Sequence, residues 1–324
     1  MRRVLRWMLV VVLCFSVNVA ASEAPTDARL QKAQAAFDEA EKLQKEGKYA
    51  EAIAKGEQAL ALREVVLGGT HLEVAACLIL VGELYEQQGE QARAEPLLRR
   101  GLAIREAALG EHHPDVAYSL TKLANLYSGQ GLYGQAGPLY QRALAILEAA
   151  LGKHHPHIAT VLGNLAILYR EQGLYGQAEP LYQRGLAIQE AALGKDHPHV
   201  AYSLNNLANL YREQGLYEQA EPLYQRALAI READLDKRHP LIASTIGNLA
   251  ALYEGQGFYS QAEPLYQRAL AIFEAAFGSH HPRVAAMLNN LAGLYMEQGL
   301  HDRAESLHRR ALAIWEEALG RVWI

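Results

Sequence analysis

The stretch NNLANLYREQG, at residues 205–215, recurs three times in the chain with small changes. The other copies are GNLAILYREQG at 163–173, GNLAALYEGQG at 247–257 and NNLAGLYMEQG at 289–299, so successive copies begin 42 residues apart. A fixed period of this size is the signature of a repeat architecture. The period therefore predicts the fold class before any single side chain is considered.

Two further columns of residues carry the same period. The dipeptide His-Pro begins at His113 and returns every 42 residues up to His281, and His71 continues the column upstream. Glycine recurs at the same interval from Gly47 to Gly299. We therefore divide the chain into seven repeats, which span 27–68, 69–110, 111–152, 153–194, 195–236, 237–278 and 279–320, with a tail at 321–324.

Each repeat has the pattern of two helices. In repeat 195–236, Pro198 stands where the first helix would begin, and the apolar residues after it are three or four apart. Gly215 ends this helix, and a second helix follows with Pro222 about one turn inside it. A single hairpin cannot bury its apolar side alone, so the repeats must stack. The sequence thus predicts an all-α solenoid of about seven helical hairpins.

Two more columns concern the contacts between repeats. We expect a tyrosine column to fill the gap towards the neighbouring repeat. Its members are Tyr85, Tyr127, Tyr169, Tyr211, Tyr253 and Tyr295. Glutamates such as Glu179, Glu221 and Glu263 precede the prolines of the second helices. We expect these carboxylates to be solvated charges near a helix start.

Composition narrows the functional classes. Half of the 324 residues are hydrophobic and 21% are charged, which is typical of a folded chain. The net charge of −5, with acidic and basic residues interspersed, argues against a nucleic-acid-binding protein. The chain has no glycine-rich phosphate loop, no G-x-S-x-G sequence and no H-E-x-x-H sequence. We therefore expect neither an enzyme nor a bound cofactor.

The first 21 residues differ from the rest of the chain. A basic start, MRRVLRW, overlaps the apolar run WMLVVVLCF, and Val19 and Ala21 occupy the −3 and −1 positions of a cleavage site. This pattern predicts a signal peptide cleaved near Ala21, followed by a linker at 22–26. The alternative is an uncleaved anchor, which needs about 20 apolar residues, whereas Ser16 and Asn18 interrupt the run. We expect an exported bacterial protein, periplasmic or extracellular, with no membrane span after cleavage.

Metal binding is the alternative role for the remaining cysteine and for the histidines. Cys77 is the only cysteine beyond residue 21, and we expect it to be a small packed side chain. The histidines cluster in KHHPH at 153–157 and DHPH at 196–199. Column members would lie one repeat apart, roughly 10 Å, whereas zinc ligands lie within about 2.1 Å of the ion. We expect a turn at the helix start, with His before Pro, and no metal.

The order of residues within a repeat resembles the tetratricopeptide repeat. That repeat usually spans about 34 residues, and the longer version here, with its ALG…HP segment, is similar to the repeat of kinesin light chains. The resemblance implies a right-handed superhelix of helical hairpins. The resemblance does not extend to a motor role. Kinesin light chains carry a heptad coiled coil before their repeats, whereas here the expected signal peptide and a short linker precede the first repeat. The residues that carry the resemblance in repeat 195–236 are Leu207, Ala208, Tyr211, Gly215, Tyr217, Ala220, Tyr224 and Ala227.

A polar stripe remains on the first helices after the apolar residues are assigned. In tetratricopeptide proteins the first helices line a concave groove, so the resemblance places this stripe where a peptide binds. Side-chain amides offer donors and an acceptor and so hold a peptide backbone, while nearby Arg and Lys attract carboxylates. The predicted groove residues are Tyr118, Lys122, Asn125, Asn164, Arg170, Tyr202, Asn205, Asn206, Asn209, Arg212, Asn248, Asn289 and Asn290.

Two pairs of alternatives stay open. The asparagine column that contains Asn206 either contacts a ligand or fixes the packing of the repeats. Asn125 and Asn209 appear only in alternate repeats, which favours ligand contact for them. The predicted function is a non-enzymatic scaffold that binds a protein or peptide in the groove. The alternative is a structural protein that associates with itself through its C-terminal end, ALGRVWI at 318–324, where no polar capping helix follows.

Overall fold

The computed structural model describes residues 28–318 of the chain. Within these residues every regular element is helical, and none of the helices combines the length and apolar character needed to cross a membrane. The predicted all-α fold is confirmed. The expected signal peptide at 1–21, the linker at 22–26 and the tail at 321–324 lie outside the described residues.

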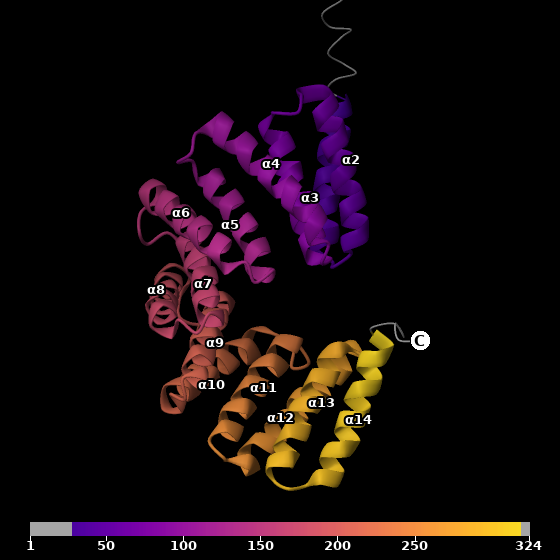
Figure 1. Cartoon of the computed structure of the whole chain (residues 1–324), viewed down its shortest axis with the longest axis vertical. Coiled ribbons are helices and arrows are strands. Elements are labelled where there is room, and N and C mark those ends of the chain that lie inside the picture. The colour runs from indigo at the N-terminus through magenta and orange to yellow at the C-terminus, as the bar shows by residue number, and fades with distance from the viewer. Residues whose placement is uncertain (1–27, 319–324) are drawn as a thin grey trace, which may run out of the picture. The chain divides into compact units, whose positions relative to one another are not determined.

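The helices fall into two compact lobes (Figure 1). Lobe 1 extends to Lys153 and lobe 2 begins at His154. Lobe 1 contains a helix at 28–45, α2 (Tyr49–Leu67), α3 (Leu72–Gln87), α4 (Gln91–Leu109), α5 (Pro114–Gly129) and α6 (Tyr133–Leu151). Lobe 2 contains α7 (Pro156–Glu171), α8 (Tyr175–Leu193), α9 (Pro198–Glu213), α10 (Tyr217–Asp234), α11 (Pro240–Gly255), α12 (Tyr259–Phe277), α13 (Pro282–Glu297) and α14 (His301–Ala318).

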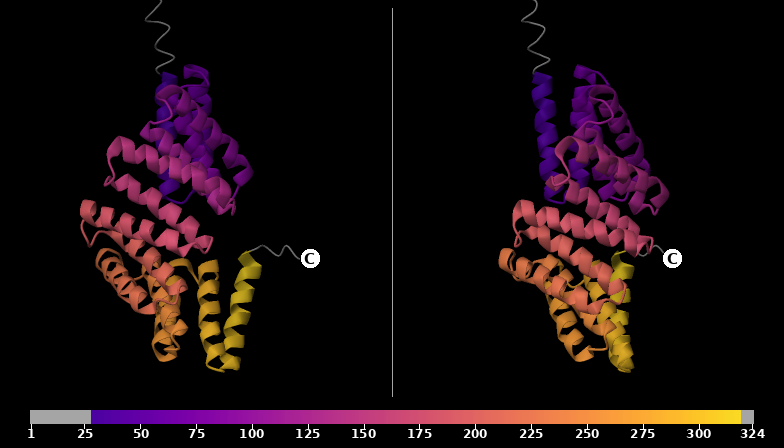
Figure 2. Two further views of the ribbon diagram at one scale, coloured as in Figure 1. Left: turned by 60° about the vertical axis from the view of Figure 1, so that its left-hand side comes forward. Right: turned by 90° about the vertical axis from the view of Figure 1, so that its left-hand side faces the viewer.

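Consecutive helices form hairpins that stack within each lobe. Figure 2 shows the C-terminal hairpin in yellow, with α13 and α14 side by side. The second helix of a hairpin also packs on the first helix of the next hairpin in its lobe. Within a lobe, consecutive first helices such as α9 and α11 approach each other closely, whereas no two consecutive second helices of the same lobe do. Each lobe is therefore tighter on the side of its first helices, which we call the inner face.

Histidine caps the first helix of each hairpin from α3 to α13. Its Nδ1 accepts a hydrogen bond from the main-chain N–H two residues later, at 3.1 to 3.3 Å. In five of these six helices the residue between the two is proline, which has no N–H to satisfy. The predicted turn at the helix start is confirmed. Within residues 28–318, no group of three His, Cys, Asp or Glu side chains is placed to hold a metal ion.

Glycine ends the helices as predicted. Gly215, between α9 and α10, has a φ angle of 74°, and Gly194, which follows α8, has a φ angle of 90°. This left-handed region is open to glycine but is strained for a residue with a Cβ atom. The glycine column thus lets the chain reverse direction within a few residues.

Apolar packing holds the hairpins together. Ala208 and Ala220 are fully buried, and their small side chains let α9 and α10 approach closely. Leu207 and Leu210 of α9 belong to the same cluster as Tyr182 of α8, so this packing continues into the preceding hairpin. Burying one leucine contributes about 1.5–3 kcal/mol relative to leaving it exposed. Contacts of this kind are the main source of stability between repeats.

A tyrosine near the end of the first helix joins a hairpin to the one before it. The hydroxyl of Tyr211 in α9 donates to Glu179 of α8 at 2.9 Å, and that of Tyr253 in α11 donates to Glu221 of α10 at 2.7 Å. The predicted place of these tyrosines between repeats is confirmed. These glutamates lie near a helix start, as expected, but they are half-buried rather than fully solvated, because each accepts a hydrogen bond from a part-buried tyrosine hydroxyl. We call Tyr127, Tyr211, Tyr253 and Tyr295 the junction tyrosines.

A second set of residues is matched across the junctions within each lobe. One partner stands in the last turns of a second helix, and the other stands in the next first helix. Where one partner is polar, so is the other. The polar matched pairs are Arg63–Cys77, Arg105–Ser119, Gln189–Ser203 and Arg231–Thr245, each joined by a hydrogen bond. At the junction between α12 and α13 both partners, Phe273 and Met287, are apolar and lie in one cluster.

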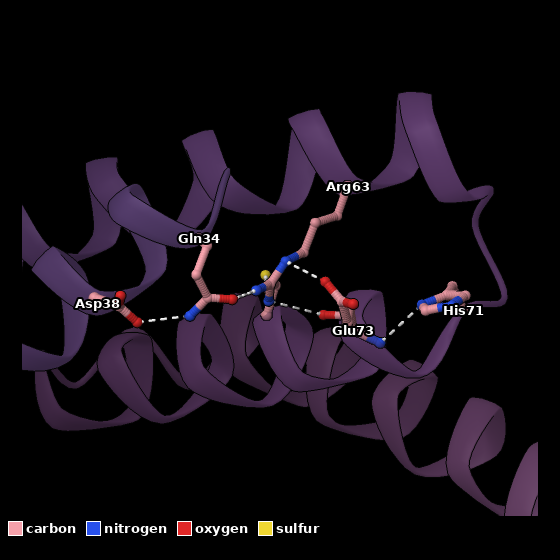
Figure 3. A network of polar contacts seen from close by, with 6 residues as sticks. Gln34, Asp38, Arg63, His71 and Glu73 are labelled. Atoms are coloured by element: carbon pink, nitrogen blue, oxygen red, sulfur yellow. Dashed lines mark hydrogen bonds and ion pairs between the residues drawn. The ribbon is translucent and has the colours of Figure 1, made fainter. Parts of the chain in front are cut away.

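Figure 3 shows Arg63, one partner of the first pair, among the polar side chains around it. Arg63 is buried, and its Nη2 donates to Gln34 Oε1 at 2.5 Å. Its Nε lies 3.1 Å from the carboxylate of Glu73, and its Nη1 lies 3.2 Å from the sulfur of Cys77. Cys77 is fully buried, and burial raises the pKa of its thiol. The predicted packed role of Cys77 is confirmed.

Ion pairs connect the second helices on the outer side of each lobe. A representative distance is 2.5 Å, between Arg226 Nη1 and Glu190 Oε1. The pairs are Arg100–Glu64, Arg142–Glu106, Arg226–Glu190, Arg268–Glu232 and Arg310–Glu274. Pairs that face solvent contribute only about 0–1 kcal/mol each. Long side chains thus bridge the outer side of a lobe, while direct helix contact closes its inner side.

Candidate functional site on the inner face

In lobe 1 the predicted groove residues Tyr118, Lys122 and Asn125 all lie on α5. The hydroxyl of Tyr118 and Nζ of Lys122 each donate to the carboxylate of Glu83 on α3, at 2.9 Å. Glu83 is buried, and burial, followed by the charge of Glu83, raises the pKa of the neighbouring Glu86. Lys122 is therefore neutralised within the protein, which weakens its predicted attraction for a ligand carboxylate.

Asn125 and Asn209 have partners within their own hairpins. Oδ1 of Asn125 accepts a hydrogen bond from the hydroxyl of Tyr140 at 2.6 Å, and Oδ1 of Asn209 accepts one from Tyr224 at 2.5 Å. Both tyrosines belong to second helices and are almost completely buried. Burial raises the pKa of Tyr224 to about 12. These two asparagines therefore satisfy buried hydroxyls and contribute to packing.

The alternation of these asparagines has a structural cause. In the hairpin α7–α8, Ile167 stands in the place of asparagine, and the buried hydroxyl of Tyr182 has no hydrogen-bond partner among the described residues. In the hairpin α11–α12, Ala251 stands there, and the hydroxyl of Tyr266 donates to Glu254 at 2.5 Å instead. The inference that alternation speaks against a structural role was wrong, because the partner of the tyrosine changes from hairpin to hairpin.

The other asparagine columns divide between packing and exposure. Nδ2 of Asn248 in α11 donates to Oδ1 of Asn205 in α9 at 3.2 Å, so this pair joins two first helices. In contrast, Asn206 and Asn290 make no side-chain hydrogen bond to another residue in the described part of the chain. Asn290 is exposed and Asn206 is half-buried. Both roles considered for the asparagines therefore have candidates in lobe 2.

Three predicted residues complete the inner face of lobe 2. Asn164 is half-buried on α7. Tyr202 on α9 is about half-exposed, and the guanidinium of Arg231 lies 5.0 Å from the centre of its ring. Asn289 on α13 is exposed, and its Oδ1 lies 3.1 Å from Nδ1 of His308. Tyr202 is therefore the aromatic side chain among these three, and about half of it is exposed.

Two arginines lie beside the buried tyrosines of lobe 2. Nη2 of Arg170 lies 2.5 Å from Glu171, and its Nε lies 3.7 Å from Glu213. Arg212 has no ion pair within residues 28–318, and its buried Nε has no hydrogen-bond partner there. Burial raises the pKa of Tyr182, so its unpartnered hydroxyl stays protonated and can donate. The donors on Arg212 and Tyr182 are thus two of the four buried side-chain donors of lobe 2 that lack an acceptor among residues 28–318, and the other two are Nε2 of Gln214 and Nε of Arg231.

The sequence pattern missed the contribution of the second helices to this face. Tyr182 and Tyr224 belong to a column with a period of 42 residues, but that column was assigned only to the buried side of the second helix. The pattern also missed Glu83, because among the equivalent positions of the other first helices only Glu41 is also a glutamate. A tyrosine among the aliphatic residues on the buried side of a second helix is the available signal, since its hydroxyl must find a partner.

The sequence matches the profile of the tetratricopeptide repeat family. The matched segments are 31–107, 102–149, 115–191, 157–233 and 241–321, which leave few residues beyond position 30 unmatched. Among curated proteins, no sequence matches this chain.

Solved structures show the same kind of repeat. BtubC (BKLC) from P. vanneervenii is 25% identical, with a TM-score of 0.57 over 79% of this chain and 94% of that one. A putative kinesin light chain from P. anserina, with nearly identical TPR-like repeats, is 28% identical, with a TM-score of 0.55 over 64% of this chain and 98% of that one. A Rap protein complexed with Competence and Sporulation Factor is 16% identical, with a TM-score of 0.65 over 88% of this chain and 75% of that one. This last likeness concerns the fold alone.

Proposed function

Because the chain belongs to the tetratricopeptide repeat family, we propose that it is a non-enzymatic scaffold that holds a peptide or helix of a partner protein on the inner face of lobe 2. The similarity to solved structures with kinesin-light-chain-like repeats supports this proposal at the level of the fold. A solved Rap protein, which is similar in fold, is complexed with Competence and Sporulation Factor. The features below are specific to this chain.

The observation that carries the proposal is the unused hydrogen-bonding capacity of this face. Nε of Arg212 and the hydroxyl of Tyr182 are buried donors without acceptors in the described part of the chain. An unsatisfied buried polar group costs about 1–3 kcal/mol. A partner that displaced the side chains covering these atoms would supply the missing acceptor from a main-chain carbonyl or a carboxylate. The amides of Asn206 and Asn290 would add donors and acceptors that suit a peptide backbone.

The place of action is part of the same proposal. Residues 1–21 have the pattern of a secretory signal peptide, and we propose that the scaffold acts in the periplasm or outside the cell. Proteins of the cell envelope are therefore the proper source of partners for an experiment.

Partner capture with matched variants tests this function. The test variant combines Asn206→Ala, Arg212→Ala and Asn290→Ala on the inner face. The control variant combines Glu232→Ala and Arg268→Ala, which removes an ion pair on the outer side of the same lobe. Circular dichroism and thermal unfolding first establish that both variants fold. Each protein then captures partners from the envelope fraction of the source cell, and affinity for the captured partner is measured by titration.

We expect the control to retain its partner and the inner-face variant to lose at least about tenfold in affinity, because each lost hydrogen bond to a charged group is worth about 1.5–3 kcal/mol. Equal affinity of both folded variants would contradict the proposal, and the search would move to the outer side.

A further inference from the structure

Four junctions between hairpins use the same acceptor for a tyrosine hydroxyl. A glutamate in the first turns of a second helix accepts the hydroxyl of a junction tyrosine at 2.7 to 2.9 Å. A Gln or Arg four residues later donates to that glutamate and holds it in place. The four sets are Glu95–Arg99 with Tyr127, Glu179–Gln183 with Tyr211, Glu221–Gln225 with Tyr253, and Glu263–Gln267 with Tyr295.

The last described helix, α14, has a fifth acceptor of this kind. Arg309 lies 2.6 Å from Glu305, just as Arg99 lies 2.8 Å from Glu95 in α4. In α4 the next hairpin covers the pair, and the side chain of Glu95 is 35% exposed. In α14 the side chain of Glu305 is 60% exposed. Glu305 thus has the arrangement of an occupied acceptor but receives no tyrosine from residues 28–318.

An open cavity of about 470 Å³ adjoins this acceptor. Its apolar part includes Leu312, which is 57% exposed. The equivalent residues Leu228 and Leu270, in α10 and α12, are half-buried and pack in the cluster shared with neighbouring helices. The cavity therefore lies where the other junctions receive a first helix. The lining residues that matter here are Met296, Glu305, His308, Arg309 and Leu312.

The helix that closes a junction has a fixed contact face. In α9 this face consists of Leu207, Leu210 and Tyr211, which pack in one cluster with Leu186 of α8, the equivalent of Leu312. The face corresponds to the pattern L-x-x-L-Y. Within the described residues, every helix with this pattern is already used in its own hairpin, as the burial of Tyr127 and Tyr295 illustrates. A second folded copy of the chain therefore has no such face to offer.

We propose that this cavity on α14 binds a helix of a partner protein that carries L-x-x-L-Y. Its tyrosine hydroxyl donates to Glu305, and its leucines pack against Leu312 and Met296. This contact lies at the end of lobe 2 and does not depend on ligand binding to the inner face, so either proposal can fail alone.

A peptide from the chain itself is the probe. Residues 113–131 contain α5, which covers the Glu–Arg pair of α4 in the protein. The peptide, acetylated, amidated and labelled with a fluorophore, is titrated with the full chain and followed by fluorescence anisotropy. A second peptide carries Tyr127→Phe, which removes only the hydroxyl. The protein variants are Glu305→Ala and, as a control for charge on the same helix, Glu317→Ala.

We expect saturable binding that Glu305→Ala weakens at least about tenfold and that Glu317→Ala leaves unchanged. The peptide with Tyr127→Phe should bind the unchanged chain more weakly and should show little further loss with Glu305→Ala. The absence of saturable binding, or binding insensitive to Glu305→Ala, would overturn the proposal. Sedimentation of the chain alone provides a further check. Self-association that Glu305→Ala abolishes would replace the partner helix with a second copy of the chain.

Discussion

A single histidine shows how the repeat provides a hydrogen-bond acceptor for a main-chain N–H at the start of a helix. His239 precedes Pro240, and its Nδ1 accepts the N–H of Leu241, the first main-chain donor available in α11. The pattern His-Pro predicted a helix start, because proline suits the first helical position. It did not predict the cap, because Ser, Thr, Asp and Asn are the usual capping residues. The sequence therefore located this feature without revealing the bond that stabilises it.

Replacing this histidine measures the cap. His239→Ala should lower the free energy of unfolding by about 0.5–2 kcal/mol, because the N–H of Leu241 loses its side-chain acceptor. His239→Asn should lose less, because its side-chain oxygen can accept the same bond. Urea unfolding followed by circular dichroism compares the three proteins. Equal losses in both variants would mean that His239 acts through packing rather than through the hydrogen bond.

At the scale of the element, each hairpin must pack on the correct neighbour although the repeats are nearly alike. The matched pairs distinguish the junctions in lobe 2. Arg231 donates to Thr245 between α10 and α11, whereas Phe273 meets Met287 between α12 and α13. A polar partner facing an apolar one would leave a buried group unsatisfied. The pairs therefore favour the native order of hairpins over an exchanged one.

A double-mutant cycle tests this matching. Arg231→Phe alone should destabilise lobe 2, because the hydroxyl of Thr245 loses its donor and the carbonyl of Leu241 keeps only the hydroxyl of Thr245 as a side-chain donor. Thr245→Met alone should do so because the buried guanidinium loses an acceptor. The double variant reproduces the apolar pair of the later junction and should recover part of the loss, with a coupling of about 0.5–3 kcal/mol. Additive losses in urea unfolding would show that the two positions do not recognise each other.

The elements themselves were the most predictable part of the structure. Proline, glycine and the spacing of leucines fix where most helices begin, end and bury their apolar side, and these signals recur in most repeats. The hydrogen bonds between helices were less predictable. Asn209 meets Tyr224, and Glu179 meets Tyr211, across distances in sequence of 15 and 32 residues. Such pairings depend on how two helices cross, which a period alone does not specify.

At the scale of the whole molecule, the buried tyrosines give the stability a dependence on pH. Burial raises the pKa of Tyr224 to about 12, and burial likewise raises those of Tyr140, Tyr182 and Tyr266. In the unfolded chain a tyrosine ionises near pH 10. A raised pKa in the folded state means that ionisation favours the unfolded chain. Stability is therefore complete below about pH 10 and falls as the pH rises towards the folded-state values.

Thermal unfolding between pH 7 and about pH 11.5 checks this expectation. The melting temperature should stay nearly level up to about pH 10 and fall steeply above it. In Tyr182→Phe the fall should be shallower, and little stability should be lost at neutral pH, because the hydroxyl of Tyr182 has no partner in the described residues. An unchanged slope in this variant would contradict the assignment of the alkaline loss to the buried hydroxyls.

The division into two lobes and the state of each inner-face residue could not be read from the sequence. The repeat crosses the boundary at Lys153 and His154 without a change of period. Lys122 and Arg212 look alike in the pattern, yet Glu83 neutralises the first, while the second has no ion pair among the described residues. The local partner of each charge decides which residues remain available, and that partner comes from another helix.

The two sides of a lobe resist deformation differently. On the inner face, consecutive first helices pack directly on each other, and close-packed side chains have low compressibility. On the outer side, bridges such as Arg226–Glu190 and Arg268–Glu232 consist of long, flexible side chains that can lengthen or let water in at small cost. A lobe should therefore deform more easily on its outer side than on its inner face. Salt weakens such bridges, so we expect a lobe to change its curvature more easily at high ionic strength without unpacking a hairpin.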